Sequence, residues 1–437
     1  MATLTFPLSR IEGHARVEIE VRDGEVLSTR FQAMEKRGFT LMVSGVPAEQ
    51  MPVIVPRICG VCSTAHHVAA VKALEDAYGV KPPPLANTIR ELLLLGQLIQ
   101  NQATSLFVFT MPDRLGVESL FHIADDEADK GVQFNIARSA LMVRQLGTDL
   151  ITLAGGQFIH PVKAVVGGVS SGVDAGKAAA FQQRLQAALP TACNLVDAYW
   201  EISLRMKDRI GTWGDDQPAY YITSTRDEVP NLDSSTIRIM DPDGEYCCDF
   251  SASQFHDELT FEETDYSYAG RTSYKGGVMR ANSLARANMT RKMGTKLADD
   301  YLTRLRDEFG SPAHPILLFD LCRGIELVYA IERAIEMLNQ RLDDADTDVP
   351  YTPKDGEGWG LVEAPRGPLI HHYVIEGGNI KVGEFIIPTV HNMLAIERAL
   401  RVAAERYITS DSVNMELERA VGRVVRAFDP CIACATH

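Results

Sequence analysis

Residues 429–437 read DPCIACATH, and this short segment decides how the rest of the sequence is interpreted. It places Cys431 and Cys434 one helical turn apart, with His437 three residues further on. Two thiolates and an imidazole in so short a tail are a typical set of metal ligands. We therefore predict that this tail forms one half of a metal site.

A second cysteine pair, Cys59 and Cys62 in RICGVCSTAHH, lies near the other end of the sequence. Two C-x-x-C pairs can supply four sulfur ligands, and sulfur selects metals such as zinc, iron or nickel. Because almost the whole chain lies between the two pairs and no long linker interrupts it, we expect the N-terminal segment and the C-terminal tail to meet at one buried centre.

The composition is that of a large globular enzyme. Of 437 residues, 46% are hydrophobic and 23% are charged, which argues against disorder. The excess of 58 acidic over 43 basic residues gives a formal charge of −15, which repels phosphate backbones and anionic membranes. We expect no nucleic-acid partner.

Cellular location is predicted from what the sequence lacks. Its eight cysteines are too sparse for a disulfide framework, which favours a reducing compartment. The start, MATLTFPLSRIEGH, is not a signal peptide. The most apolar run, residues 92–109, is interrupted by amides at 97 and 100–102, so we expect a buried helix and no direct membrane span.

Hydrophobic periodicity predicts long helices and a few hairpins. We expect helices over residues 63–78, 85–109, 124–154, 178–209 and 284–342, the last broken at 310–312, and β-structure over 16–33, 217–250 and 369–390. The predicted fold class is α+β and mainly helical, a central bundle of long helices with peripheral β-hairpins. We expect a single integrated domain over 1–437, with a β-rich part at 1–55 and a helical core with hairpin insertions at 56–437.

The helix over residues 63–78 follows Cys62 directly. Ser63 is a suitable cap and Gly79 a suitable stop. Cysteines at a helix N-terminus are favoured as thiolates, the form that a metal requires. His67 belongs to the apolar stripe of this helix and is expected to be a packed histidine, whereas His66 lies nearer the face of the site.

Several motifs together resemble the large, catalytic subunit of nickel-iron hydrogenases. These are RIEGH at residues 10–14, RICGVC at 57–62, EAPRG at 363–367, Ile387-Pro388-Thr389, and the final DPCIACATH, in the order and spacing of that family. The resemblance runs from residue 10 to the end of the sequence. Each motif alone is weak, but the ordered set is specific.

The resemblance implies a nickel-iron centre that cleaves dihydrogen heterolytically and reversibly. Cys59 and Cys431 would bind nickel terminally, and Cys62 and Cys434 would bridge nickel to an iron that carries carbonyl and cyanide ligands. A coordinated thiolate can accept the proton that cleavage releases.

Further site residues follow from the same resemblance. Glu12 matches the carboxylate that takes the proton from Cys431, and Arg366 matches the guanidinium above the open metal position. Thr389, beside Pro388, matches a hydroxyl that hydrogen-bonds a cyanide, and His66 a histidine that hydrogen-bonds the bridging cysteine.

Two positions depart from the family pattern. Relatives often carry a glutamate at the position of Thr40, which with the C-terminal histidine, here His437, holds a magnesium-like ion; Thr40 argues against that ion. Asn101-Gln102 replaces an Asp or Ser followed by His, which changes the outer wall of the pocket. The family is also made with an extension that is removed after the histidine, so we expect this chain to be the processed form.

The remaining cysteines predict a partner protein. Cys247 and Cys248 are adjacent in a predicted strand and point to opposite faces, and Cys193 and Cys322 stand alone, so no further four-thiolate cluster can form. Electrons must therefore leave through an iron-sulfur small subunit, and possible further electron-transfer subunits. The ending CATH and the missing export signal resemble the cytoplasmic, cofactor-coupled branch of the family.

Two other interpretations remain open from the sequence. The four paired cysteines could hold one structural zinc, although this gives no reason for RIEGH or EAPRG. The chain could also be a quinone-site subunit related to respiratory complex I, although members of that group lack the two cysteine pairs. Metal analysis distinguishes a nickel-iron centre, a structural zinc site and a metal-free subunit related to complex I.

Overall fold

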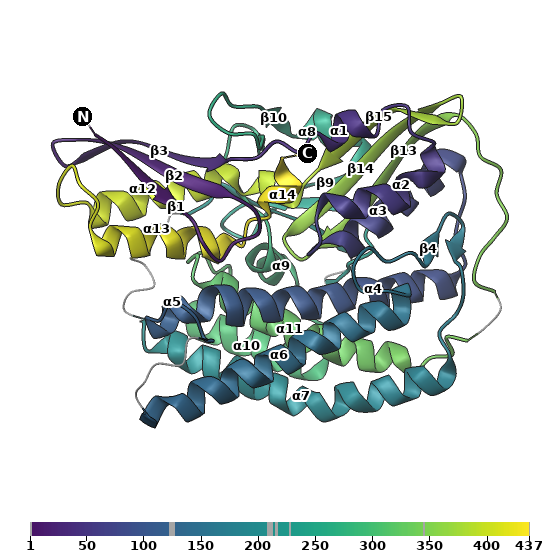
Figure 1. The fold of residues 1–437 in the computed structure, drawn as a ribbon, viewed down its shortest axis with the longest axis horizontal. Helices are drawn as coiled ribbons and strands as arrows, with labels where there is room; N and C mark the ends of the chain where they lie inside the picture. Colours follow the sequence, from purple (N-terminus) through teal and green to yellow (C-terminus); the bar gives the residue numbers. More distant parts are fainter. Residues whose placement is uncertain are drawn as a thin grey trace.

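Long helices form a bundle on one side of the molecule, and small sheets lie across it on the other (Figure 1). The computed structural model describes residues 2–121, 127–207, 213–214, 217–226, 229–343 and 346–436. The predicted fold class, α+β and mainly helical, is confirmed. The predicted helix ends Ala124 and Arg209 lie outside the described residues.

The bundle is built around α4, which packs against α6 and α11. A Cβ added at Gly147 of α6 would lie 2.6 Å from the carbonyl oxygen of Gly96 in α4, so glycine allows this close crossing. By length and composition, the helical run Pro84–Leu115 could cross a membrane, but 83% of its most apolar window is buried inside the protein, as expected for a core helix. The bundle comprises α4 (Pro84–Ala103), a π-helical continuation (Thr104–Thr110), α5 (Met111–Leu115), α6 (Glu127–Gly155), α7 (Ala175–Leu204), α10 (Lys296–Phe309) and α11 (Leu318–Leu338).

The N-terminal sheet is antiparallel, in the order β1-β2-β3 (Ala2–Pro7, Ala15–Arg22, Glu25–Ala33). The predicted hairpin over 16–33 is confirmed. Val17, Ile19 and Val21 are fully buried and alternate with more exposed residues, as a sheet with one solvated face requires. Strand β1 was not predicted, because its apolar residues Leu4 and Phe6 alone are too short a signal.

A second antiparallel sheet carries the EAPRG segment at its first turn. Its strands are β13 (Gly356–Ala364), β14 (Gly367–Glu376) and β15 (Asn379–Ile386). The hairpin β14–β15 was predicted, but β13 was not. Helix α3 (Ser63–Tyr78) lies directly on β13, because Gly358 and Gly360 leave room for its backbone: a Cβ at Gly360 would lie 2.0 Å from the carbonyl oxygen of Ala69. This contact sets the start of α3 against the turn that carries Arg366.

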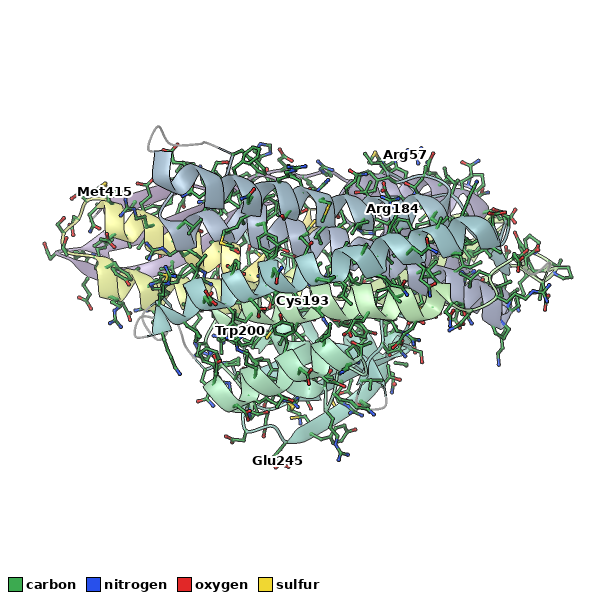
Figure 2. All side chains as sticks on the ribbon, turned by 90° about the horizontal axis from the view of Figure 1, so that it is seen from below. Arg57, Arg184, Cys193, Trp200, Glu245 and Met415 are labelled. Atoms are coloured by element: carbon green, nitrogen blue, oxygen red, sulfur yellow. The ribbon has the colours of Figure 1, made fainter. Side chains whose placement is uncertain are left out.

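The predicted β-structure over 217–250 belongs to a third sheet, in the order β12-β6-β8-β9, with β7 paired to β6. Its strands are β6 (Tyr220–Arg226), β7 (Val229–Pro230), β8 (Thr236–Met240), β9 (Tyr246–Ser251) and β12 (Met279–Arg280). Two short strand pairs are β4–β5 (Ala164–Val165, Gly168–Val169) and β10–β11 (Thr260–Glu262, Arg271–Ser273). Seen from below, Cys193 lies on α7 between Arg184 and Trp200 (Figure 2).

The helical region predicted over 284–342 is three helices, because a second break at residues 290–295 separates α9 from α10. The C-terminal tail ends in α14, which lies between the N-terminal sheet and the β13–β15 sheet (Figure 1). The remaining helices are α1 (Phe39–Met42), α2 (Met51–Ile54), α8 (Phe255–Glu258), α9 (Ser283–Met289), α12 (Met393–Tyr407), α13 (Met415–Phe428) and α14 (Ile432–Ala435).

Candidate metal centre

The two cysteine pairs meet at one buried point. The sulfurs of Cys59, Cys62, Cys431 and Cys434 all lie within 4.8 Å of one another, and none forms a disulfide. Cys434 Sγ is 2.8 Å from the sulfurs of both Cys62 and Cys431, and Cys59 Sγ is 3.5 Å from that of Cys431. The expectation that the ends of the chain share one site is confirmed.

Local structure presents the first pair. A 3₁₀ turn (Val55–Ile58) ends at Cys59, where the backbone becomes extended, and α3 begins after Cys62. The prediction that Ser63 caps α3 was wrong by one residue: Cys62 occupies the N-cap position, and no side chain caps the helix. The free N–H groups of the first turn therefore favour negative charge on this cysteine.

The four thiols need a cation to ionise together. Burial raises the pKa of Cys62, Cys431 and Cys434, whereas hydrogen bonds from neighbouring thiols, that of Cys431 first, lower the pKa of Cys59. One thiolate is thus stabilised by its neighbours, but four adjacent buried thiolates are not. Soft thiolate ligands in this arrangement fit zinc, nickel or iron.

Glu12 fastens the tail to the N-terminal segment. Its Oε2 lies 3.0 Å from Cys431 Sγ and accepts a hydrogen bond of 3.0 Å from the Ala433 N–H, and its backbone oxygen accepts one from Ile432. Gly13 has φ +82°, and a Cβ there would lie 2.9 Å from the Ala433 nitrogen, so glycine is required for this approach. Burial, with the charge of Cys59 as a second cause, raises the pKa of Glu12 to about 7.

Arg366 is held beside the cysteines by Asp429. Its Nε donates to the Asp429 carbonyl oxygen (2.5 Å) and its Nη2 to Oδ1 (3.0 Å). Asp429 ends α13 in a left-handed conformation with φ 48°. Asn101 Nδ2 donates to the other carboxylate oxygen at 3.3 Å, so this residue contacts the support of Arg366 but does not line the cavity described below.

A small cavity of about 20 Å³ adjoins the sulfurs. It is apolar over most of its wall, and its volume suffices for one molecule of the size of water. Thr389 Oγ1 accepts a hydrogen bond from the Cys431 N–H (3.0 Å), so its own hydroxyl hydrogen is available to a ligand in the cavity. The wall consists of Cys62, His66, Ala364, Pro365, Arg366, Leu369, Ile387, Pro388, Thr389, Cys431 and Cys434.

The two adjacent histidines of α3 behave differently. His66 lines the cavity, and its Nδ1 lies 2.9 Å from His371 Nε2, whose ring in turn contacts the Tyr373 hydroxyl at 2.7 Å. His67 is a packed histidine, as predicted: Nδ1 donates to the Pro52 oxygen and Nε2 accepts from the Ala164 N–H. Burial lowers the pKa of His67 to about 4.

His437, a predicted ligand of a magnesium-like ion, lies outside the described residues. At the last described residue of the tail, the Arg37 N–H donates to the Thr436 oxygen at 2.7 Å, and Thr40 is exposed on α1. Thr40 therefore presents no carboxylate to the tail.

Sequence reasoning did not predict three residues around the site. Asn101 was expected only as a changed wall position, without its hydrogen bond to Asp429. His371 and Tyr373 are buried and alternate with the half-buried His372 and Val374 on β14, so the period of a strand could have indicated that they face inward.

Comparison with known proteins identifies the family. The model described as "Nickel-dependent hydrogenase" matches residues 37–136 and 231–437, and one described as "HoxL-like" matches residues 6–35. The vhu F420-non-reducing hydrogenase of Methanococcus voltae has a subunit that is 32% identical over 408 residues, 91% of this chain and 97% of the relative. The beta subunit of the NAD-reducing hydrogenase HoxS of Cupriavidus necator is 28% identical, over 99% of this chain and 94% of the relative.

Solved structures of hydrogenases have the same fold as this chain. A crystal structure of an NAD+-reducing [NiFe]-hydrogenase in the H2-reduced state superposes with a TM-score of 0.91 at 28% identity and covers 100% of both chains. A [NiFeSe]-hydrogenase of Dm. baculatum, with a TM-score of 0.80 at 22% identity over 100% of this chain and 99% of that chain, shares the fold. With the four-cysteine centre described above, these similarities show that the chain belongs to the nickel-dependent hydrogenases, as a large subunit that activates dihydrogen at a nickel-iron site.

Proposed function

We propose that Cys59 and Cys431 bind nickel alone and that Cys62 and Cys434 are shared between nickel and iron. In support, Cys62 and Cys434 both line the small cavity, where iron would carry its further ligands; Cys431 also lines it, and Cys59 does not. When bound, the metal pair supplies the Lewis acidity that polarises dihydrogen for reversible heterolytic cleavage.

Glu12 is the proton acceptor. The Cys431 sulfur takes the proton that leaves dihydrogen, and Glu12 Oε2, 3.0 Å away, takes it from the sulfur. A pKa of about 7 lets the carboxyl both accept and return a proton near neutral pH, as a reversible reaction requires. This contact between a buried carboxyl and one metal-binding sulfur is the observation that carries the proposal.

Arg366 is the fixed cation of the cavity. Because its two hydrogen bonds to Asp429 hold the guanidinium in one orientation, its charge is directed at the cavity and the sulfurs without any rearrangement during the reaction. Asp429 is thus a positioning residue for Arg366.

The chemistry of the cavity wall suits carbonyl and cyanide ligands. Apolar side chains such as Pro388 and Leu369 surround a carbonyl without competing for it, and the Thr389 hydroxyl can donate a hydrogen bond to a cyanide nitrogen. His66 shares this wall with the bridging Cys62, and its contact with His371 through Nδ1 orients the imidazole for a hydrogen bond to that sulfur.

Electrons leave through an iron-sulfur small subunit. Among the described residues, which include all eight cysteines, one group alone could hold a metal, and it is the four-cysteine centre. Relatives of this chain are themselves named as subunits of hydrogenases. We propose further that residues 1–437 act as one integrated domain and that the enzyme works in the cytoplasm, as the similarity to F420-non-reducing and NAD-reducing hydrogenase subunits favours.

Metal analysis and infrared spectroscopy of the enzyme purified with its partner test the proposal. We expect nickel and iron in equal amounts at this site, and infrared bands of iron-bound carbonyl and cyanide. Zinc alone would instead support a structural site, and no metal would support the complex I-like alternative.

A variant tests whether the Thr389 hydroxyl donates a hydrogen bond to a cyanide on iron. Thr389→Val keeps the shape of the side chain and removes its hydroxyl, so a cyanide band should shift. The bond from the Cys431 N–H is lost as well, and the contacts of Glu12 with the tail should keep the metal content near that of the parent. Thr223→Val, a change at a buried threonine of β6, is the control and should leave the bands in place. Identical spectra for all three proteins would contradict the role given to Thr389.

A further inference from the structure

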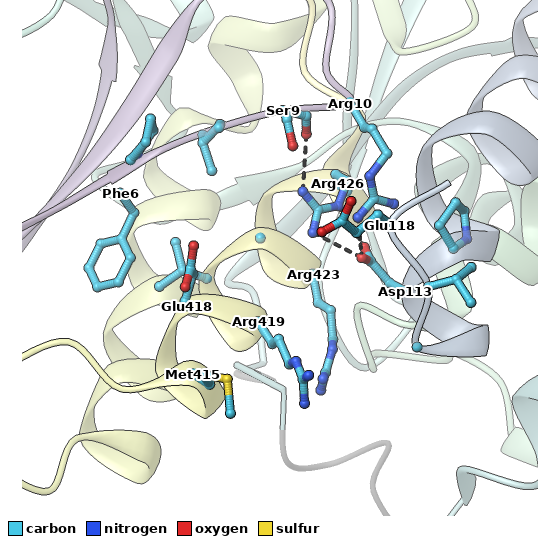
Figure 3. A pocket seen from close by; sticks show the side chains of 17 residues that line it. Phe6, Ser9, Arg10, Asp113, Glu118, Met415, Glu418, Arg419, Arg423 and Arg426 are labelled. Atoms are coloured by element: carbon cyan, nitrogen blue, oxygen red, sulfur yellow. Dashed lines mark hydrogen bonds and ion pairs between the residues drawn. The ribbon is translucent and has the colours of Figure 1, made fainter. Parts of the chain in front are cut away.

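A second and larger cavity, here called the arginine pocket, lies between the N-terminal segment at residues 6–10, α5 and α13 (Figure 3). Its volume is about 400 Å³, within the range of small-molecule sites. Four arginines and three carboxylates line it, in a protein whose overall charge is −15. These are Arg10, Arg419, Arg423 and Arg426, with Asp113, Glu118 and Glu418.

Two of the arginines share one carboxylate. Arg426 donates to both oxygens of Asp113, at 2.6 and 3.0 Å, and Arg10 donates to the same residue at 2.6 Å (Figure 3). One negative charge thus faces two positive ones. Over the whole lining, four arginines face three carboxylates, which leaves one positive charge in excess.

The positive charges of the other two arginines are less neutralised by carboxylates. Arg419 and Arg423 are four residues apart on α13, and their side chains lie side by side and point in the same direction (Figure 3). Like charges at this spacing destabilise a helix. Arg419 has one long contact of 3.5 Å with Glu416, and Arg423 lies over the Trp213 ring at 4.5 Å with no hydrogen bond to any described residue.

Two buried N–H groups without a described partner line a smaller cavity next to the arginine pocket. A smaller cavity of about 10 Å³ shares Asp113 and Arg423 with the arginine pocket. Arg114 Nη1 and Trp213 Nε1, from two buried residues that line this smaller cavity, have no hydrogen-bond partner among the described residues. Buried N–H groups are nearly always paired, so both donors can take an acceptor beyond the described residues.

We propose that the arginine pocket binds a phosphate-class oxyanion, held by the guanidinium groups of Arg419 and Arg423 at its mouth. A dianionic phosphate matches two adjacent guanidinium groups in charge, and its oxygens match their forked donors. Binding would remove the repulsion within α13. Nothing in the cleavage of dihydrogen uses this pocket.

Calorimetric titration of the complete enzyme with inorganic phosphate tests the site. The double variant Arg419→Gln/Arg423→Gln should lose phosphate affinity by at least about tenfold, since it removes two charge-assisted contacts. Arg184→Gln/Arg401→Gln is the matched control, because it removes two exposed arginines elsewhere and should bind as the parent does.

Two further titrations, one of a single variant and one with acetate, complete the experiment. Arg419→Gln alone alters an exposed side chain and should also weaken binding, which answers any folding defect of the double variant. Sodium acetate should bind the parent more weakly than phosphate. The proposal is overturned if the parent does not bind phosphate, if the control loses as much affinity as the double variant, or if acetate binds equally well.

Discussion

The two cysteine pairs share one spacing and one metal site, but different parts of the protein hold them. Cys59 and Cys62 precede α3, a helix that is packed along β13 through glycines. Cys431 and Cys434 belong to a short tail, and that tail is fixed by hydrogen bonds to Glu12 and Thr389, which lie far away in the sequence. The first pair is therefore set by packing and the second by polar contacts, and the residues of proton chemistry adjoin the second.

The largest effect on metal binding is expected when a cysteine of the second pair is replaced. Cys431→Ser replaces a soft thiolate by a hard hydroxyl at the sulfur nearest Glu12, and the loss of metal affinity should exceed the roughly 10–100-fold cost of losing an outer-shell partner. Nickel content and hydrogen uptake should both fall to background. Cys322→Ser, a change at a buried cysteine of α11, is the control and should retain nickel.

Glu12→Gln separates metal binding from proton transfer. The amide keeps the shape and can still accept from Ala433, but it cannot carry a proton, so exchange of dihydrogen with solvent deuterons should fall by about 10²–10⁴-fold. Nickel and iron should remain. His14→Gln, two residues on and exposed, should exchange normally. Near-normal exchange in a fully loaded Glu12→Gln enzyme would give the proton another route, with Asp429 as the next candidate.

Arg366→Lys tests whether orientation matters as well as charge. Lysine keeps the positive charge but cannot make both contacts to Asp429, so kcat should fall by about 10–100-fold, the equivalent of one charge-assisted hydrogen bond. Metal content and infrared bands should change little. An unchanged kcat would mean that charge alone suffices at this position.

The smallest effect concerns the packing behind the first pair. Burial lowers the pKa of His67 from 6.5 to about 4, and its Nε2 already accepts a backbone N–H, so protonation is possible only at a cost to the fold. The unfolded chain then binds the proton more readily, and stability is lost as pH falls from about 6.5 towards 4. Near pH 5.5 the loss is about 1.4 kcal/mol.

His67→Gln can keep both hydrogen bonds and removes the titration. Its melting temperature should therefore decline less steeply with acid than that of the parent enzyme. His14→Gln, at an exposed histidine, should decline nearly as the parent does. Part of the acid sensitivity should remain in every variant, because burial also lowers the pKa of His391 to about 4.

Much of the fold could be predicted because its signals are local. The limits of α3 followed from the residues between Cys62 and Gly79, and the hairpins from their glycine turns and alternation. Strand β13 was missed since it is rich in glycine, and those glycines serve contacts with α3 that no local pattern shows.

The site could be predicted as a set of residues but not as a set of contacts. The paired cysteines indicated a metal, and the resemblance supplied roles for Glu12 and Arg366. That Asp429 holds Arg366, and that Asn101 reaches Asp429, depends on side chains brought together from three distant segments. Such contacts exist only once the chain has folded.

The closure of the tail onto Gly13 has a consequence for how the protein is made. Glu12 leaves the ribosome 419 residues ahead of its neighbour Cys431 and 421 residues ahead of Ala433. Contacts between such distant residues close large loops and form late. The first cysteine pair can thus be in place on α3 while the other side of the centre is still being translated, so metal delivery has a natural interval before the tail seals the site.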